Sequence, residues 1–395
     1  VVHVDLTVLV WFLSFAGVFW SFNSTENCSA CGWGALYLCL AGTAVITLAP
    51  FLGAGGPLMN NYVPVLQDPI FFVGLGLFGL GFTTLVLRGL LFSRPIGTAI
   101  SSTGALRFGL LTALLLALLA VLALIASWYG IPDSAEGKAY YELLFWGGGH
   151  TIQFTHVQLM LVSWLWLATA SGATPNLHPR IVVLLFCVGA IPALLLTPYI
   201  YLAYDVGSAT HILGLTWLMQ YGGGLAALPL ALIIVLTVIR TNGASHEVRA
   251  ERNALLFSIL LFGVGGVIGF LISGSNVTIP AHYHGSIVAV TLAYMGITYH
   301  ILPKLGFRKP LGKLVNLQPV LYGSGQLMHV LGLAWSGGYG VQRKTAGAEQ
   351  GLKSIQEIMG MGIMGLGGMI AIIGGILFLV IVFKAMWPQR DGSHE

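Results

Sequence analysis

Charged side chains are scarce in this chain of 395 residues. Asp, Glu, Lys and Arg make up 8% of it, hydrophobic residues make up 56%, and the mean hydropathy is +0.87. Soluble globular domains carry about 25% charged residues, so this composition excludes that class. The net charge of +4 is small and gives no indication of nucleic-acid binding.

The sequence also lacks a Pro- or Ser-rich linker, an internal repeat and the short alternating segments of a membrane β-barrel. It contains instead many apolar runs near the roughly 20 residues that a helix needs to cross about 30 Å of hydrocarbon. These runs are residues 3–22, 35–53, 69–92, 107–129, 140–171, 181–203, 209–239, 254–274, 281–303, 315–336 and 358–387. The sequence therefore predicts an all-α polytopic membrane protein with about eleven transmembrane helices in a single domain, residues 1–395.

Lys and Arg are unevenly distributed over the ends of the predicted spans. One side receives Arg88, Arg94, Arg107, Arg180, Arg240, Arg249, Arg252, Lys304, Arg308, Lys309, Lys313, Lys384 and Arg390. The other side receives only Lys138, Arg343, Lys344 and Lys353. The positive-inside rule makes the first side cytoplasmic, which places residues 1–2 outside and the C-terminus inside. The sequence starts without Met, close to a span and without a cleavable signal peptide, so we expect a preceding helix to be missing or supplied by another chain.

Cysteine is rare, with four residues. Cys28 and Cys31 form a CxxC in "NCSACGW", but no His follows, as attachment of a c-type haem would require. The predicted topology puts this loop inside, where a stable disulfide is not expected in a reducing cytoplasm. An ordinary loop is the favoured interpretation, with a metal or redox role as the alternative. Cys39 and Cys187 are expected to be small core residues.

Two histidines open the apolar segment "IPAHYHGSIVAVTLAYMGITYHILPKLG", which begins at Ile279. His282 and His284 are two positions apart, so a regular helix separates their directions by about 200°. They cannot chelate one metal together from such a helix. Each can bind a different large cofactor, one on either side of the same helix.

Other histidines lie at the same outer level of the predicted topology, namely His3, His150, His211 and His329. The inner ends hold His178, His246, His300 and His394, which we interpret as ordinary interfacial residues. Ionisable residues within membrane helices are functional candidates, and the alternative is a hydrogen bond to a neighbouring helix. Carboxylates are nearly absent at the outer level, which argues against a site for a hard cation. Glycine runs such as "WGGGH", ending at His150, leave flat space, and axial histidine is a common haem ligand, so the sequence predicts two haems.

These segments resemble subunit I of the haem–copper oxidase superfamily, which includes cytochrome oxidases and the large subunit of nitric oxide reductases. The resemblance rests on the "HYH" at His282–His284, "VHVDLTVLVWFLSFAGVFW", "FWGGGH", "PLMNNYVPVLQDPIFF", "LPKLG" and "LMHVLGLAWSGGYGVQRK". It covers nearly the whole chain in order and starts at the second of the family's twelve helices.

The resemblance implies a role for each matching residue. His3 and His284 correspond to the two axial ligands of a low-spin haem, and His282 to the single ligand of a high-spin haem. His150 corresponds to the first ligand of a second metal, which is copper in oxidases and non-haem iron in nitric oxide reductases. Arg343 and Lys344 correspond to a basic pair over the haem propionates, a role that suits charged hydrogen-bond donors.

The chain departs from the family at the second metal. An adjacent His-His pair is expected in "LLLTPYIYLAYDVGSATH", where Tyr199 and Ile200 stand. The remaining nitrogen donors nearby are His211 and His156, and His156 lies about 240° around the helix from His150. Either an altered metal site is built from His150 with a tyrosine or Asp205, or there is no second metal. Tyr199 and Tyr201 are the candidate catalytic phenols beside His150, and Tyr204 and Tyr221 are further phenols.

The resemblance implies a respiratory terminal oxidase that passes electrons from the low-spin to the high-spin haem and reduces O2. A nitric oxide reductase-like enzyme, a degenerate electron-transfer subunit without a second metal, and a transporter with glycine-broken helices are the alternatives. Glu142, Asp205 and Lys304 are the candidate proton-handling residues. The expected partners are cytochrome c- or quinol-facing subunits and membrane lipid, without nucleic acid. The expected location is a bacterial or archaeal inner membrane.

Overall fold

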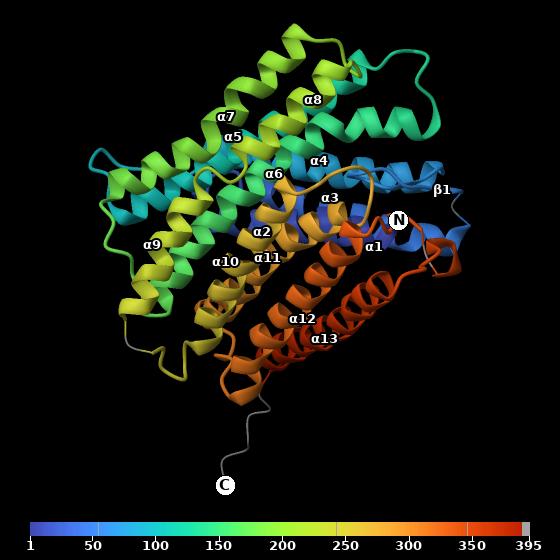
Figure 1. Cartoon of the computed structure of the whole chain (residues 1–395). Helices are drawn as coiled ribbons and strands as arrows, with labels where there is room; N and C mark the ends of the chain where they lie inside the picture. The colour runs from blue at the N-terminus through green and yellow to red at the C-terminus, as the bar shows by residue number, and fades with distance from the viewer. Residues whose placement is uncertain (54, 242, 346, 389–395) are drawn as a thin grey trace. The chain divides into compact units, whose positions relative to one another are not determined.

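The structure is a computed structural model of the chain and describes residues 1–53, 55–241, 243–345 and 347–388. Arg390 and His394, which entered the charge and histidine predictions, lie outside the described residues. Within the described residues, each of the eleven predicted spans holds one helix or one continuous helical run (Figure 1). Nine of these runs are long and apolar enough to cross a membrane, and the other two contain α6 and α12. The all-α polytopic membrane fold is confirmed.

The chain divides into two compact units, residues 1–162 with 177–227 and residues 163–176 with 228–395. The first unit contains α1 (Val2–Asp5), η1 (Leu6–Trp11), α2 (Phe12–Phe22), α3 (Ser29–Leu48), η2 (Ala49–Leu52), β1 (Pro57–Leu58), β2 (Val65–Leu66), α4 (Pro69–Phe92), α5 (Ser102–Gly130), most of α6 (Gly137–Ala170), α7 (Pro179–Ala203), α8 (Ala209–Trp217) and η3 (Leu218–Gly222). The second contains the end of α6, α9 (Ala227–Arg240), α10 (Arg249–Phe270), α11 (Thr278–Ile301), η4 (Leu302–Leu305), α12 (Lys313–Gly338), η5 (Gly347–Gln350) and α13 (Ile355–Met386). The single domain of residues 1–395 stays a prediction.

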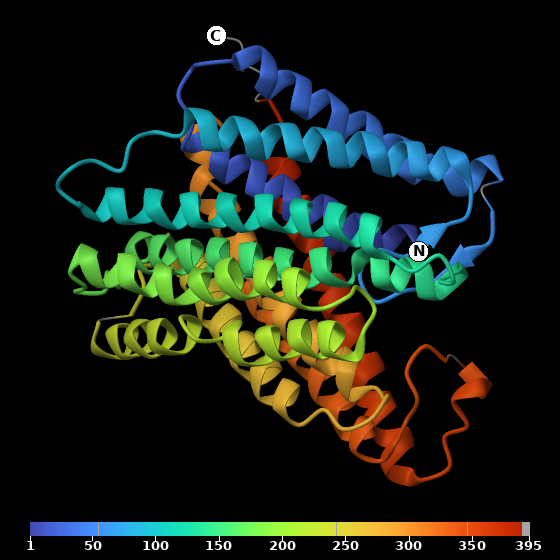
Figure 2. The ribbon, with the colours of Figure 1, turned by 90° about the horizontal axis from the view of Figure 1, so that it is seen from above.

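Glycine allows close helix packing in the first unit. Figure 2 shows α4 running between α3 and α5. A Cβ on Gly42 of α3 would lie 2.5 Å from the backbone nitrogen of Phe78 on α4, and a Cβ on Gly81 of α4 would lie 2.8 Å from that of Cys39 on α3. Small residues at such crossings let membrane helices approach through backbone contact. The glycine-rich composition therefore serves helix packing here.

The second unit uses the same device twice. On α13, Gly360, Gly367 and Gly374 recur every seven residues and face α12, which runs beside α13 in Figure 1. A Cβ on Gly374 would lie 2.7 Å from the backbone nitrogen of Tyr322. Helices α10 and α11 meet at Gly265 and Gly285, where a Cβ on Gly285 would lie 2.7 Å from the Cα of Gly265. This second crossing lies next to the two histidines that open α11.

Candidate functional site

His282 is fixed by a backbone carbonyl of the neighbouring helix. Its Nδ1 lies 2.7 Å from the carbonyl oxygen of Gly265 on α10. Because a carbonyl only accepts hydrogen bonds, Nδ1 carries the proton and donates it, which leaves Nε2 as a lone-pair donor. Gly269, one turn further along α10, leaves the room, since a Cβ there would lie 2.7 Å from Nδ1. Gly269 therefore leaves a socket for the imidazole, and the carbonyl of Gly265 holds the ring in it.

His284 contacts the other neighbour of α11. Its ring centroid lies 4.9 Å from that of His329 on α12, with the planes at 74°. His329 in turn donates from Nδ1 to the carbonyl oxygen of Met364 on α13, at 3.0 Å. His282 and His284 thus contact different helices, as their spacing predicts.

The loop after α12 brings basic residues to the start of α11. Asn276 and Gln342 form an isolated antiparallel bridge, and the N–H of Val277 donates to Val341 across it at 2.9 Å. Arg343 follows this bridge directly and is close enough to Tyr283 for its charge to act on the phenol. Lys344 comes next, with a left-handed backbone (φ 63°). The structure therefore brings the predicted basic pair beside the turn that carries His282 and His284.

In the first unit, His150 lies against a tyrosine from a distant loop. Nδ1 of His150 is 2.8 Å from the hydroxyl of Tyr62 and 2.8 Å from the carbonyl oxygen of Trp146. The carbonyl only accepts, whereas the phenol can donate to Nδ1 or accept from it. His150 is buried, so these two partners decide which of its ring nitrogens carries the proton.

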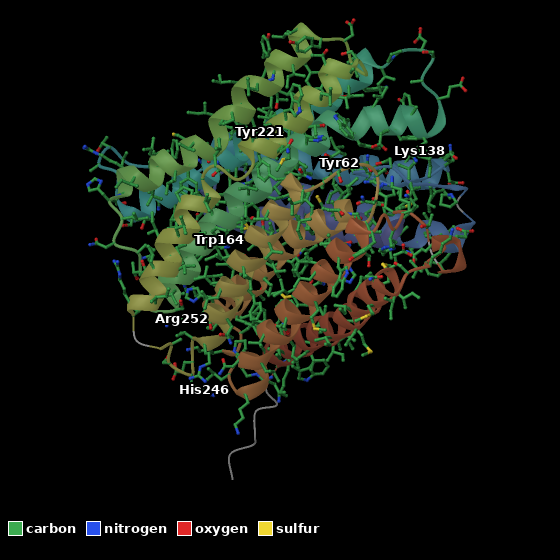
Figure 3. All side chains as sticks on the ribbon, viewed as in Figure 1. Tyr62, Lys138, Trp164, Tyr221, His246 and Arg252 are labelled. Atoms are coloured by element: carbon green, nitrogen blue, oxygen red, sulfur yellow. A yellow bond between two sulfur atoms is a disulfide. The ribbon has the colours of Figure 1, made fainter. Side chains whose placement is uncertain are left out.

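Tyr62 is held by the turn between β1 and β2. The side-chain oxygen of Asn60 accepts hydrogen bonds from the N–H groups of Tyr62 and Val63, at 2.9 Å each. Burial raises the pKa of Tyr62, and the negative charge of Glu142 raises it further. Asn61 donates a hydrogen bond to Glu142, so the loop links a carboxylate to the His150 neighbourhood. Tyr62 therefore remains a neutral phenol at physiological pH (labelled in Figure 3).

Tyr201 also belongs to the polar cluster around α6. Its hydroxyl lies 2.6 Å from that of Ser127, and its ring centroid lies 4.9 Å from that of His211. A Cβ on Gly147, one turn before His150, would overlap the Tyr201 hydroxyl. His211 is 0% exposed, and neither ring nitrogen has a hydrogen-bond partner among the described residues. Two buried imidazoles and two half-buried phenols thus gather in one region.

The second candidate phenol lies elsewhere. Tyr199 is 56% exposed, and its ring contacts Tyr204, with 6.2 Å between centroids. Tyr201 lines an open cavity of about 290 Å³ together with Tyr204 and Asp205. Of the two predicted tyrosines, Tyr201 is therefore the one placed beside the histidines.

The remaining predicted residues occupy separate places. His3 is exposed on α1 and belongs to the first unit, whereas His284 belongs to the second, so their pairing stays a prediction. His156 stacks on Phe12, with 5.0 Å between ring centroids. Lys304 lies over the Trp166 ring, 5.3 Å from its centroid.

One expectation is wrong. Cys28 and Cys31 form a disulfide, where an ordinary loop was favoured. The helix α3 begins at Ser29, earlier than the predicted residue 35, so Cys28 is its N-cap residue and Cys31 lies in its first turn. The two cysteines are three positions apart at the start of a helix, and this spacing brings their side chains together.

Sequence reasoning missed several residues of these sites. Asp5, two positions after His3, is 1% exposed, and neither carboxylate oxygen has a partner within the part of the chain that the structure describes. Its presence inside an apolar span was the available signal. Tyr62 and Ser127 meet their partners across 88 and 74 residues, and no local pattern indicates such pairs.

A conventional multi-ligand metal site is absent from the described residues, where no three His, Cys, Asp or Glu side chains group suitably for a metal ion. His150 and His211 offer two nitrogen donors, and tyrosine is the other polar group nearby. Both sequence-based alternatives for the second metal therefore stay open.

No known family model matches the chain. It is similar, at 28% identity over 469 aligned positions, to an uncharacterized protein of Rickettsia prowazekii (strain Madrid E), with 100% of this chain and 89% of the relative covered. It is also similar, at 28% identity over 319 positions, to an uncharacterized protein of Aquifex aeolicus (strain VF5), with 80% and 77% covered. The name of neither relative states an activity or a ligand.

Proposed function

We propose that this chain is a haem-containing membrane oxidoreductase that resembles the catalytic subunit of a respiratory terminal oxidase. When bound, a low-spin haem supplies an electron relay, and a high-spin haem supplies an iron at which O2 is reduced. The observation that carries the proposal is the hydrogen bond from His282 to the Gly265 carbonyl, combined with His284 on another face of the same helix.

This hydrogen bond has the form expected of a metal ligand. A histidine that binds a metal through one nitrogen usually donates the other N–H to a carbonyl or carboxylate, which fixes the ring and makes the ligand more basic. His282 meets this requirement, and Nε2 is the atom left for iron. Gly269 leaves the space that the ring occupies, and the absence of a side chain at Gly265 lets the two helix backbones approach each other beside it.

The basic pair supports the same assignment. Arg343 and Lys344 follow a bridge that fastens their loop to the start of α11. Haem propionates are carboxylates, and charge-assisted hydrogen bonds from Arg or Lys stabilise them. Few Lys and Arg residues are predicted on this side of the membrane. The presence of Arg343 and Lys344 next to the α11 histidines therefore favours a cofactor with negatively charged groups at its edge.

The His150 cluster is proposed to handle protons. Tyr62 can give a proton to Nδ1 of His150 or accept a hydrogen bond from it, and Tyr201 shares a hydrogen bond with Ser127. Neutral phenols beside imidazoles can transfer protons over hydrogen-bond distances. His150 is proposed as a ligand of a second metal, copper or non-haem iron, if that metal is present.

The membrane setting completes the proposal. The chain is an integral membrane protein, and we place it in a bacterial or archaeal inner membrane with a cytoplasmic C-terminus, on the basis of the Lys and Arg distribution. Partner subunits that face cytochrome c or quinol would supply the electrons. Haem, electron transport and oxidoreductase activity all depend on this proposal.

A reduced-minus-oxidised absorption spectrum of the purified full chain, recorded with and without carbon monoxide, tests the function. An oxidase or nitric oxide reductase gives haem bands, part of which shift with carbon monoxide. Haem bands that do not shift with carbon monoxide would exclude gas reduction and support the second candidate function, an electron-transfer subunit. That candidate is favoured by Tyr199 and Ile200 standing where a His-His pair is expected. A spectrum without haem bands would refute the proposal and favour the alternative that the chain is a transporter.

Metal analysis of the same preparation decides the second site. An altered or missing site predicts less than one copper per chain. Stoichiometric copper would show that the segment "TPYIY" has not lost the site.

A further inference from the structure

The Cys28–Cys31 disulfide lies apart from the histidine sites and plays no part in the proposed haem chemistry. Cys28 is the exposed N-cap residue of α3, and Cys31 is half-buried in its first turn. Cys39 and Cys187 are free thiols inside α3 and α7. The pair therefore forms a separate sulfur site at the end of a helix.

Arg88 binds the loop that carries this pair. Arg88 lies near the end of α4. Its Nε donates to the carbonyl of Cys28 at 3.0 Å, and one terminal nitrogen donates to the carbonyls of Thr25 and Asn27, at 3.2 Å each. Gly32 makes room for the guanidinium, since a Cβ there would lie 3.3 Å from Nε. A permanent positive charge is thus held against the backbone of Cys28.

The same loop is fastened to the end of α4 at further points. Ser24 and Ser93 form an isolated antiparallel bridge, and the N–H of Thr25 donates to Phe92 at 2.8 Å. Arg94 donates from Nε to the carbonyl of Ser24 at 3.2 Å. Cys28 is an exposed residue at the end of a loop that these bonds hold in place, so a partner thiol can approach it without unfolding the helices.

Two features of this arrangement stabilise the thiolate form of the reduced cysteine pair, and so favour reduction of the disulfide. The N-terminus of a helix carries a partial positive charge, and Cys-x-x-Cys pairs at such positions are the reactive kind. The Arg88 guanidinium adds a full charge beside Cys28. The positive-inside distribution puts this end in the cytoplasm, where disulfides are typically transient and either catalytic or redox-sensing.

We propose that Cys28–Cys31 is a thiol–disulfide exchange site that accepts two electrons from a dithiol at this membrane face. A thiolate of the dithiol attacks the sulfur of the exposed Cys28, the Cys28–Cys31 bond breaks, and Cys31 leaves as a thiolate. The donor's second thiol then attacks the donor's first sulfur, which is bonded to Cys28 in the mixed disulfide. This attack forms the donor's disulfide and releases Cys28 as a thiolate beside Arg88. Two protons pass to the cysteine pair or solvent, and the donor ends as a disulfide.

The test uses the full chain in lipid nanodiscs with Cys39→Ser and Cys187→Ser, so that the pair supplies the thiols. Dithiothreitol is the reducing probe, oxidised glutathione is the oxidising probe, and a polyethylene-glycol maleimide counts free thiols by gel shift. We expect both thiols to appear together without denaturant and to disappear together on reoxidation. A pair that is reduced only after unfolding, or that does not reoxidise, would overturn the proposal.

Arg88→Gln supplies the sharper comparison. Loss of the charge is expected to slow reduction about threefold, the size of one exposed charge–charge interaction, and Arg88→Lys should restore the rate. Arg94→Gln is the matched control, since Arg94 braces the loop through Ser24 without bonding to Cys28. Equal rates in the Arg88 and Arg94 variants would contradict the role of Arg88.

The side of the membrane is tested separately with a membrane-impermeant maleimide on reduced right-side-out and inverted vesicles. Labelling from the face that was cytoplasmic supports a cytoplasmic dithiol as the donor. Labelling from the opposite face alone would exclude that donor. Neither experiment depends on haem, so the proposed oxidoreductase function and this site can fail independently.

Discussion

Gly269→Ala is the variant that tests the His282 socket most specifically. A Cβ at Gly269 would lie 2.7 Å from Nδ1 and 2.8 Å from Cε1 of His282. Both distances are far shorter than normal van der Waals contacts of a carbon atom, and the packed backbone of α10 cannot easily move away. The imidazole must therefore leave its position and give up its hydrogen bond to Gly265.

The expected cost comes from the overpacking. Extra volume in a filled site costs about 1–3 kcal/mol. A penalty of roughly 2 kcal/mol on the seated imidazole shifts the equilibrium about 30-fold toward the displaced position, where the ring nitrogen no longer binds iron.

The assay is the carbon monoxide-sensitive absorbance per mole of purified protein. We expect Gly269→Ala to lose more than half of it while keeping the remaining haem bands. Gly266→Ala is the control, because it lies on the same helix and a Cβ there would meet nothing within 4 Å. Equal carbon monoxide-sensitive absorbance in the two variants would refute the argument that the glycine socket positions a ligand.

Two further predictions concern stability. Burial raises the pKa of Tyr62 in the folded state. Above about pH 10 the phenol therefore ionises in the unfolded state first, and the free energy of unfolding falls as the pH rises. Tyr62→Phe should therefore give a shallower loss of melting temperature between pH 9 and 11 than Tyr199→Phe, and equal slopes would contradict this. Gly332→Ala, whose Cβ would overlap the Met364 backbone, should lower stability by about 1–3 kcal/mol in thermal unfolding, whereas Gly362→Ala should not. Identical melting of these two glycine variants would exclude close α12–α13 packing.

The fold was predictable because apolar length is a strong signal in a membrane protein. The boundaries were less predictable where polar residues extend a helix. The predicted run 107–129 is the helix Ser102–Gly130, since the Ser101 side chain caps it by accepting a hydrogen bond from the Gly104 N–H at 3.1 Å. The predicted run 35–53 begins at Ser29, because small residues around the cysteine pair join the helix.

The candidate site was predictable only where the geometry of a single helix sets the direction of a side chain. The spacing of His282 and His284 fixes their different directions, and the structure places them against α10 and α12. The Gly265 carbonyl that orients His282 comes from another helix, so nothing local indicates it. Tyr62 likewise reaches His150 from a loop 88 residues earlier. Such partners depend on which helices pack together, and single-sequence patterns do not contain that information.

The measurement that tests the central claim most directly is the number of haems per chain, determined as pyridine haemochrome in the wild type, His282→Ala and His284→Ala. Two haems are expected in the wild type. His282→Ala should lose the carbon monoxide-sensitive haem, and His284→Ala should lose the other one. If both variants keep two haems with unchanged spectra, the two histidines of α11 are not iron ligands and the account is wrong.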